Sequence, residues 1–247
     1  MNWKIKIALL FFILSACESK QEYNSDEEPH DKKNYLIEID DLKKIESKAN
    51  YKILDFRKQE DYQKGHIKGA LNIWRTDIEN KSYPYSGMMA DRFQIESLFS
   101  NLGIETNDTI IIYDDNGLCD AARLWWILQN YNFYNVKLLH GGLSAWIANN
   151  GVISLQSPSV KKTNFILPKT SLMNYYLSKE DMQTALNTNT VILDTRSFEE
   201  YSGKRQKKGA SKGGRIPNSV HIDWAEAINY KGDKRLKTIE ALEAIYS

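Results

Sequence analysis

The chain has little cysteine and no long run of charge of one sign. Its 247 residues include two cysteines, Cys17 and Cys119, so no intramolecular disulfide is possible if Cys17 is modified as argued below. Lys and Arg total 33 against 32 Asp and Glu, which gives a net charge of +1. Basic residues are not interleaved with aromatic ones in the pattern typical of nucleic-acid-binding proteins. Nucleic acid is therefore not an expected partner.

Long hydrophobic runs are also scarce. The clearest one lies near the N-terminus. Two lysines precede an apolar segment at 7–14, which is too short for a stable bilayer-spanning helix of roughly 20 residues. Leu-Ser-Ala-Cys follows at 14–17, a small-residue cleavage site that resembles the bacterial lipobox. We interpret residues 1–17 as a lipoprotein signal peptide that ends at an acylated Cys17. A plain secretory signal that happens to end near a cysteine is the alternative.

Residues 18–34 follow this signal and contain one aromatic and no aliphatic residue. Such a segment cannot bury enough surface to offset the entropy of ordering it, so we expect a flexible tether. With a lipid on Cys17, the protein would be anchored to a membrane of the bacterial cell envelope and face the periplasm or the cell exterior. About 210 residues remain, enough for one full domain and most of another.

The most informative feature of those residues is a pattern that occurs twice. The two copies read Ile-Leu-Asp-Phe-Arg at 53–57, Tyr62 and Gly-His-Ile-Lys-Gly-Ala at 65–70, then Ile-Leu-Asp-Thr-Arg at 192–196, Tyr201 and Gly-Arg-Ile-Pro-Asn-Ser at 214–219. Aspartate and tyrosine are seven residues apart in both, and the second copy has ten extra residues before its glycine. The offset of 139 residues exceeds the roughly 20–50 residues of a solenoid repeat, so the pattern indicates a duplicated domain.

Strand-like and helix-like stretches alternate along the first copy, which is typical of an α/β fold with a mainly parallel sheet. We expect helices at 40–45, 92–102, 121–129 and 143–149, and strands at 52–55, 70–73, 109–113 and 136–139. The β-branched, apolar strand at 109–113 suits the middle of the sheet.

The domain boundaries follow from these patterns. We expect a first domain at 36–151, a linker at 152–176 that contains two prolines, and a second domain at 177–247. The second domain should begin with a helix capped by Ser178, with Asp181 in the capping-box position. A strand at 191–194 and a helix from 238 should follow.

Several motifs together resemble the tandem rhodanese sulfurtransferases, of the thiosulfate and mercaptopyruvate types. They are Leu54-Asp55-x-Arg57, Gly65-His66-Ile67-x-Gly69-Ala70, Tyr113-Asp114, Ala122-Arg123-x-Trp125-Trp126 and Leu139-x-Gly141-Gly142-Leu143-x-Ala145-Trp146. The resemblance covers about 36–247. It implies two rhodanese-like α/β domains, each a mainly parallel sheet flanked by helices, with the second incomplete. We expect no cofactor and no metal.

The resemblance also implies a chemistry. The family needs a cysteine at the end of the central strand, where loop amides and a helix N-terminus favour thiolate and persulfide. That cysteine takes a sulfane sulfur from a small anionic donor and passes it to a thiol or cyanide acceptor. Asp114 occupies this position in the first copy, which matches the family's habit of an inactive first domain.

The corresponding position of the second copy follows by counting. Asp114 lies 61 residues after Ile53, and the same interval plus the ten-residue insertion, counted from Ile192, leads to about position 263. The catalytic cysteine is therefore expected beyond residue 247.

Cys119 has two interpretations. It stands beside a helix N-terminus, which lowers a thiol pKa and would suit a sulfur carrier. Alternatively it is a small apolar residue packed in a loop. Its register, five residues past Asp114, favours the second.

The duplicated polar residues also have two interpretations. Asp55 and Arg57 could form a catalytic pair, but a structural role is favoured because the inactive copy keeps both. His66 could be a general base, but its counterpart in the second copy is Arg215, which favours packing or hydrogen bonding. The tryptophans of the first copy are expected in the core or between the domains.

Two further features concern the donor. The insertion at 203–213 carries five positive charges; it is either a solvated loop or a rim that attracts a small dianion. Where mercaptopyruvate enzymes have an arginine for the substrate carboxylate, this chain has Glu200, which favours thiosulfate. Two functions remain open: an envelope sulfurtransferase, or a non-catalytic rhodanese-like binding or structural module.

Overall fold

The computed structural model describes residues 35–247. The expected signal peptide, the acylated Cys17 and the tether at 18–34 therefore lie outside the described residues. Within 35–247, no helix combines the length and the hydropathy that crossing a bilayer would require.

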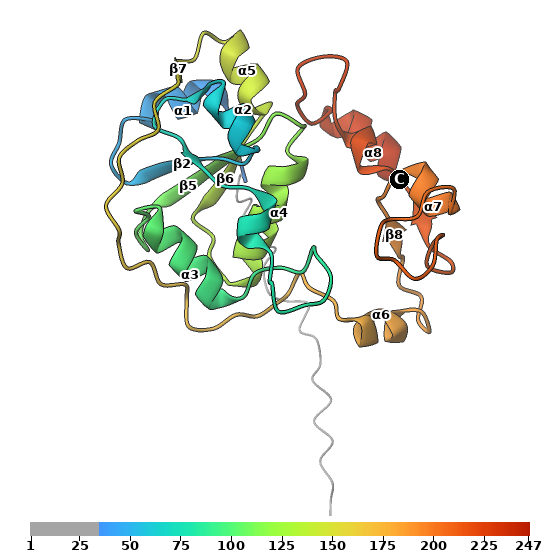
Figure 1. The fold of residues 1–247 in the computed structure, drawn as a ribbon. Helices are drawn as coiled ribbons and strands as arrows, with labels where there is room; N and C mark the ends of the chain where they lie inside the picture. The colour runs from blue at the N-terminus through green and yellow to red at the C-terminus, as the bar shows by residue number, and fades with distance from the viewer. Residues whose placement is uncertain (1–34) are drawn as a thin grey trace, which may run out of the picture. The chain divides into compact units, whose positions relative to one another are not determined.

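A five-stranded sheet forms the centre of the first copy (Figure 1). In spatial order its strands are β1 (Leu36–Ile37), β6 (Val136–Leu139), β5 (Thr109–Tyr113), β2 (Tyr51–Asp55) and β4 (Leu71–Asn72). All neighbouring strands are parallel. The prediction for 109–113 is confirmed, because β5 occupies the middle of the sheet.

Helices cover both faces of this sheet. The helices of the first copy are α1 (Ile39–Ile45), α2 (Gln59–Gln63), the 3-10 helix η1 (Arg75–Ile78), α3 (Arg92–Asn101), α4 (Cys119–Asn130) and α5 (Gly142–Ala148). Figure 1 shows α1 and α5 on one face and α3 and α4 on the other. The expected mainly parallel α/β fold is confirmed.

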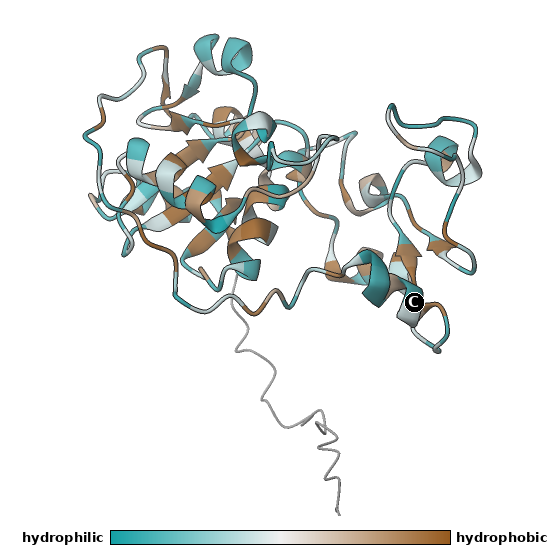
Figure 2. Ribbon diagram, turned by 60° about the horizontal axis from the view of Figure 1, so that its bottom comes forward, coloured by the Kyte–Doolittle hydropathy of each residue, from teal (hydrophilic) through white to brown (hydrophobic). Residues whose placement is uncertain are grey.

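Alternation along β5 divides the core into two apolar clusters. Ile110 and Ile112 face the cluster that includes α3 and α4, whereas Ile111 and Tyr113 face the one that includes α1 and α5. This is the period of two that a strand imposes on its side chains. Figure 2 shows the resulting hydrophobic interior of the sheet with hydrophilic residues on the outer sides of the helices.

The second copy repeats part of this arrangement. Its elements are α6 (Lys179–Ala185), β8 (Leu193–Asp194), α7 (Phe198–Ser202), β9 (Val220–His221), the 3-10 helix η2 (Trp224–Ala227) and α8 (Ile239–Tyr246). β8 and β9 are parallel, with Leu193 opposite Val220, as Leu54 is opposite Leu71 in the first copy. The N-cap prediction is also confirmed, because Ser178 and Asp181 form a reciprocal capping box on α6.

The segment at 152–176, expected as a linker, does more than join two units. Its β7 (Ile153–Ser154) pairs antiparallel with β3 (His66–Ile67). Further along, the side chains of Phe165 and Leu167 are each 1% exposed, and the Phe165 ring packs edge-on against Phe99 at 5.0 Å. We call residues 152–168 the strap, because they cross the first copy and complete its core.

Replacing Phe165 with alanine should destabilise the protein by about 3–5 kcal/mol, because a fully buried aromatic ring is removed and a cavity remains. The matched control is Ile166→Ala, whose side chain is 51% exposed and should cost less than about 1 kcal/mol. Urea unfolding of the two variants measures the difference. Equal destabilisation by both would show that the strap is not part of the core.

Candidate functional site

The candidate site is the loop that connects β5 to α4. The strand ends at Tyr113 and the helix begins at Cys119, so five residues turn the chain. Gly117 and Leu118 both have left-handed backbone conformations, with φ of 67° and 69°. Consecutive amides in such a turn point toward a common centre and form an anion-binding concavity.

The carboxylate of Asp114 occupies that centre. Its Oδ1 accepts the backbone N–H groups of Asn116 and Leu118, both at 2.9 Å. Its Oδ2 accepts those of Asp120 at 2.9 Å and Ala121 at 3.0 Å. We call these four amides the amide cradle. The loop is thus built to hold a negative charge, and Asp114 supplies one.

Burial dominates the electrostatics of Asp114, which is 1% exposed. Burial raises the pKa of its carboxyl, and the four amide donors oppose that rise. A carboxylate can neither attack a sulfane sulfur usefully nor store it as a persulfide. The loop after β5 therefore has an anion-binding geometry, and a carboxylate, not a thiol, occupies its centre.

Cys119 is the first residue of α4 and is partly buried. Burial raises the pKa of its thiol to about 11, the charge of Asp120 adds to the rise, and Arg75 opposes it. The expected effect of the helix N-terminus on the pKa is outweighed, so the thiol is protonated at neutral pH. This favours the interpretation of Cys119 as a packed, inert residue.

Asp55 and Arg57 form a buried ion pair that closes the end of β2. Arg57 Nε donates to Asp55 Oδ1 at 2.9 Å and Nη2 donates to Oδ2 at 2.6 Å. Nη2 also donates to the carbonyl of Gly65 at 2.7 Å. Tyr113 donates its hydroxyl proton to Asp55 and accepts the N–H of Ile67 at 3.0 Å. Burial raises the pKa of Tyr113, which keeps it a donor.

The second copy repeats this pair. Arg196 binds Asp194 with the same two distances, 2.9 and 2.6 Å, and donates to the carbonyl of Gly214 at 2.9 Å. In both copies the arginine ties a strand end to the glycine that begins the next motif. The geometry therefore favours the structural interpretation of both pairs.

His66 is fully buried. Its ring lies flat on Tyr62 at a centroid distance of 3.7 Å, and its nitrogens lie 3.0 Å from the carbonyl of Tyr62 and 3.2 Å from that of Gln156 in the strap. Arg215 takes the same place in the second copy, 4.7 Å above the ring of Tyr201. The two residues share the stacking on a tyrosine ring, and the two carbonyl partners of His66 favour packing and hydrogen bonding as its role.

Of the remaining residues singled out from the sequence, Leu143 donates its N–H to the carbonyl of Asp114 at 2.9 Å, whereas the tryptophans contact other segments. Trp146 is buried and donates to the carbonyl of Val152, and Trp126 donates to that of Tyr175. Both thus join first-copy helices to the segment at 152–176. The insertion at 203–213 is exposed along its whole length. No group of three or more His, Cys, Asp and Glu within 35–247 is arranged to hold a metal.

The sequence did not reveal that the second copy covers the cradle loop. Ile228, 6% exposed, lies against Gly117, where a Cβ atom would come within 2.9 Å of its Cγ2. Tyr230 donates to the carbonyl of Asn116 at 3.2 Å and Lys234 to that of Asp115 at 2.8 Å. We call residues 228–236 the covering segment. Its one sequence signal is an Ile and a Leu on either side of a Lys-Gly-Asp turn.

Comparison with known proteins identifies a family with this fold and these motifs. The profile of the rhodanese-like domain matches residues 38–149. A thiosulfate sulfurtransferase of Azotobacter vinelandii is 30% identical over 207 residues, which cover 82% of this chain and 74% of that protein. A protein of Mycobacterium bovis named putative thiosulfate sulfurtransferase SseA is 32% identical over 192 residues, 75% of this chain. The matched region spans 63% of that relative's length.

Solved structures share the fold. The crystal structure of SseA from Escherichia coli, described as a 3-mercaptopyruvate sulfotransferase, matches with a TM-score of 0.75 and 23% identity, over 86% of this chain and 82% of that one. Tum1 from Saccharomyces cerevisiae matches with a TM-score of 0.69 and 16% identity, over 85% and 79%. The duplicated strand-end ion pair, the cradle after the central strand and these relatives lead to one conclusion: the chain belongs to the rhodanese family of sulfurtransferases.

Proposed function

We propose that this protein takes part in rhodanese-type transfer of a sulfane sulfur from a small anionic donor to a thiol or cyanide acceptor, with a first copy that is not catalytic. The observation that carries the proposal is the amide cradle, which follows the central strand and holds a single buried anion. A thiolate or persulfide in the same place in an active copy would receive the same stabilisation.

The proposed reaction has two steps. A cysteine thiolate attacks the outer sulfur of the donor, and for thiosulfate the sulfur–sulfur bond breaks as sulfite leaves with the bonding electron pair. The acceptor then attacks the outer sulfur of the persulfide, and the cysteine thiolate leaves. With cyanide as the acceptor, the product is thiocyanate. The cradle contributes by stabilising the anionic sulfur before and after each attack.

The nucleophile is proposed to be a cysteine of the second copy at about position 263, as counted from the duplicated pattern. Asp114 and the high pKa of Cys119 support its absence from the first copy. We further propose that acylation of Cys17 anchors the protein in the bacterial cell envelope.

Thiosulfate is the proposed donor, in preference to mercaptopyruvate. Glu200 stands where mercaptopyruvate enzymes would have an arginine, and its Oε2 accepts a hydrogen bond from Arg205 at 3.3 Å. A carboxylate there provides no cation to pair with the carboxylate of mercaptopyruvate.

A second candidate function is a non-catalytic binding or structural module. Two observations favour it for the described residues: Asp114 fills the cradle of the first copy, and the covering segment lies over the same loop. An aspartate at about position 263 would favour the module, whereas a cysteine there would favour the enzyme.

The protein spanning 35–247 should show no thiosulfate:cyanide sulfurtransferase turnover, because no described residue combines a thiolate with the cradle. Thiocyanate formation is measured beside a Cys119→Ala variant and beside a form extended by about 60 residues of the natural sequence, if the gene continues. Turnover that disappears in Cys119→Ala would make Cys119 the nucleophile. Turnover only in the extended form would support catalysis by the second copy.

Asp114→Cys should convert the cradle into a persulfide site, because the new sulfur takes the place of the carboxylate among the four amides. In a Cys119→Ala background, the intact mass should increase by one sulfur atom after incubation with thiosulfate, and cyanide should remove it. The matched control is Asp115→Cys, since Asp115 is exposed and accepts none of the cradle amides. Equal sulfur loading of both variants would mean that the cradle gives no stabilisation.

Cys119 should react slowly with iodoacetamide at neutral pH. A thiol pKa of about 11 in place of an ordinary 9.0 lowers the thiolate fraction at pH 7.5 by about 100-fold. The alkylation rate, followed by mass spectrometry, should still rise about tenfold per pH unit between pH 8 and 10, where free cysteine with a pKa of ~8.5 levels off. A plateau near pH 8 would contradict the raised pKa.

A further inference from the structure

A cavity of about 820 Å³ lies at the opposite end of the sheet from the amide cradle. Its walls come from the start of β2 (residues 48–52), from the turn between α3 and β5 (102–107) and from the strap (158–164). Because β2 and β5 are parallel, both begin at this cavity and end at the cradle. The cavity is therefore separate from the candidate site and independent of the proposed function.

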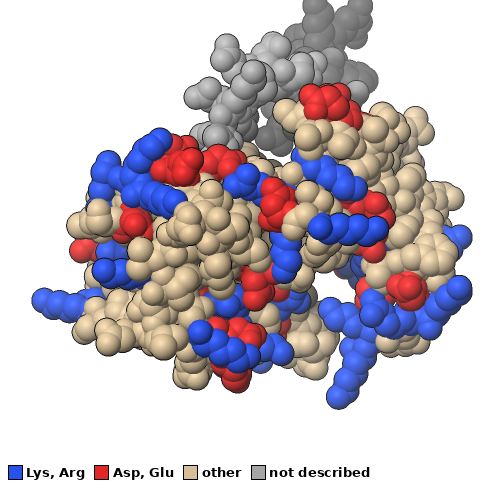
Figure 3. Space-filling view, turned by 90° about the horizontal axis from the view of Figure 1, so that it is seen from above, with Lys and Arg blue, Asp and Glu red and all other residues tan. Residues whose placement is uncertain are grey.

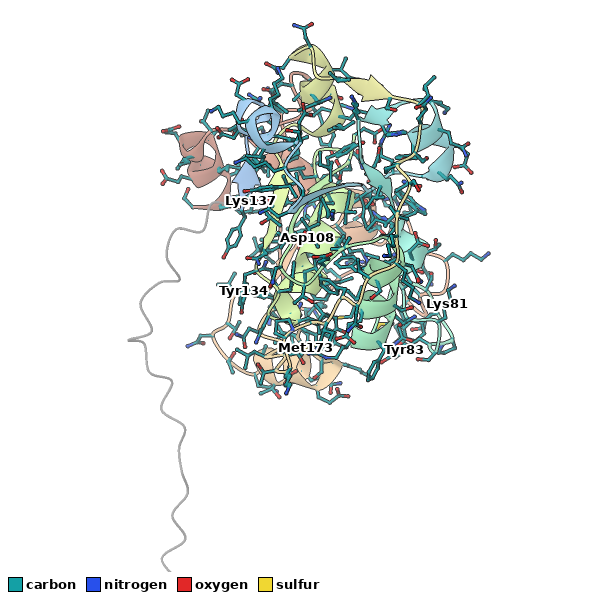
Figure 4. The ribbon with its side chains drawn as sticks, turned by 90° about the vertical axis from the view of Figure 1, so that its left-hand side faces the viewer. Lys81, Tyr83, Asp108, Tyr134, Lys137 and Met173 are labelled. Atoms are coloured by element: carbon teal, nitrogen blue, oxygen red, sulfur yellow. The ribbon has the colours of Figure 1, made fainter. Side chains whose placement is uncertain are left out.

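Positive charge is concentrated on these walls. Four lysines contribute to the lining, against a single acidic residue, Glu105; the lysines are Lys48, Lys52, Lys161 and Lys162. The ammonium group of Lys52 is neutralised by the carboxylate of Asp108, 3.7 Å away. Asp108, which directly precedes β5, is labelled in Figure 4. Figure 3 shows acidic and basic side chains intermixed over much of the face it presents.

The other three lysines have no neutralising partner. Among the described residues, no ion pair or side-chain hydrogen bond joins Lys48, Lys161 or Lys162 to another group. Three cations and one carboxylate thus face one cavity. Such a concave arrangement of like charges concentrates a positive potential inside it.

The backbone holds two of these lysines in place. Thr163 donates its N–H to the carbonyl of Ser100 at 3.0 Å and its hydroxyl proton to that of Ile104. Gly103, with φ of +68°, has no Cβ, and a Cβ there would lie 2.9 Å from the carbonyl oxygen of Lys161. The backbone of the strap at Lys161 and Lys162 is therefore fixed against the α3–β5 turn.

The rest of the lining matches an oxyanion with a small organic part. The lining also contains hydroxyl and amide side chains that can donate to anionic oxygens, namely those of Asn107, Ser159 and Asn164. An apolar wall is formed by Tyr51, Leu71, Leu102, Pro158 and Val160. The volume is within the range of about 300–1,000 Å³ that small-molecule sites occupy.

We propose that this cavity binds a small polyanion of the oxyanion class, such as a phosphate ester or a pyrophosphate, through Lys48, Lys161 and Lys162. A multiply charged sulfur oxyanion has the same chemistry and could use the same three ammonium groups. The two sources are distinguished by the probes below.

The test is calorimetric titration of the protein with sodium pyrophosphate and, separately, sodium thiosulfate, at constant ionic strength. Pyrophosphate should bind, and the triple variant Lys48→Gln/Lys161→Gln/Lys162→Gln should bind at least tenfold more weakly. The matched control is Lys207→Gln/Lys208→Gln/Lys212→Gln, which removes the same charge from the exposed insertion, outside the cavity. Its affinity should stay within about twofold of the unmodified protein.

A second measurement locates the bound anion. The backbone amide resonances of Gly103 and Thr106 should shift on titration, and those of the exposed insertion should not. Tighter pyrophosphate binding would identify phosphate compounds as the ligands, and tighter thiosulfate binding would identify sulfur oxyanions. No binding of either probe, or equal weakening in both triple variants, would overturn the proposal. All six lysines are exposed or outside the core, and circular dichroism verifies that the variants remain folded.

Discussion

The four hydrogen bonds to the Asp114 carboxylate are the constraint on which the candidate site depends. They join the end of the central strand to the first turn of α4 and fix a loop with two successive left-handed residues. Without an acceptor in this place, the three buried amides of Leu118, Asp120 and Ala121 would be unsatisfied, at about 1–3 kcal/mol for each group. This loop therefore needs a hydrogen-bond acceptor at its centre, and the carboxylate of Asp114 supplies one.

Much of the fold could be predicted from the sequence, because short-range patterns of residue type determine where its strands and helices form. β5 is β-branched and apolar, and Ser178 with Asp181 caps a helix through its own neighbours. The duplicated motif also identified the ion pairs of Asp55 and Asp194. The strap could not be predicted, because Phe165 and Leu167 stand between prolines with no period that distinguishes core from surface. Tertiary burial alone determines their place.

The candidate site was predicted less completely than the fold. The position of Asp114 follows from counting along the chain, but its acceptance of four amides depends on a loop conformation that residue types do not specify. Cys119 illustrates the same limit. Its place at a helix N-terminus suggests a low thiol pKa, whereas burial, which depends on distant residues, raises that pKa. The contact of Ile228 with Gly117 joins residues 111 positions apart, and no local pattern indicates it.

The covering segment joins the second copy to the candidate site of the first through one apolar contact and two hydrogen bonds. Among the described residues 177–247, Ile228 is the one hydrophobic residue whose side chain is buried. It packs against the cradle loop of the first copy at Gly117. Contacts with the first copy therefore help to order this segment. By linkage, the segment stabilises the cradle loop to the same extent. We therefore expect a change that displaces the covering segment to increase the solvent exposure of the loop around Asp114.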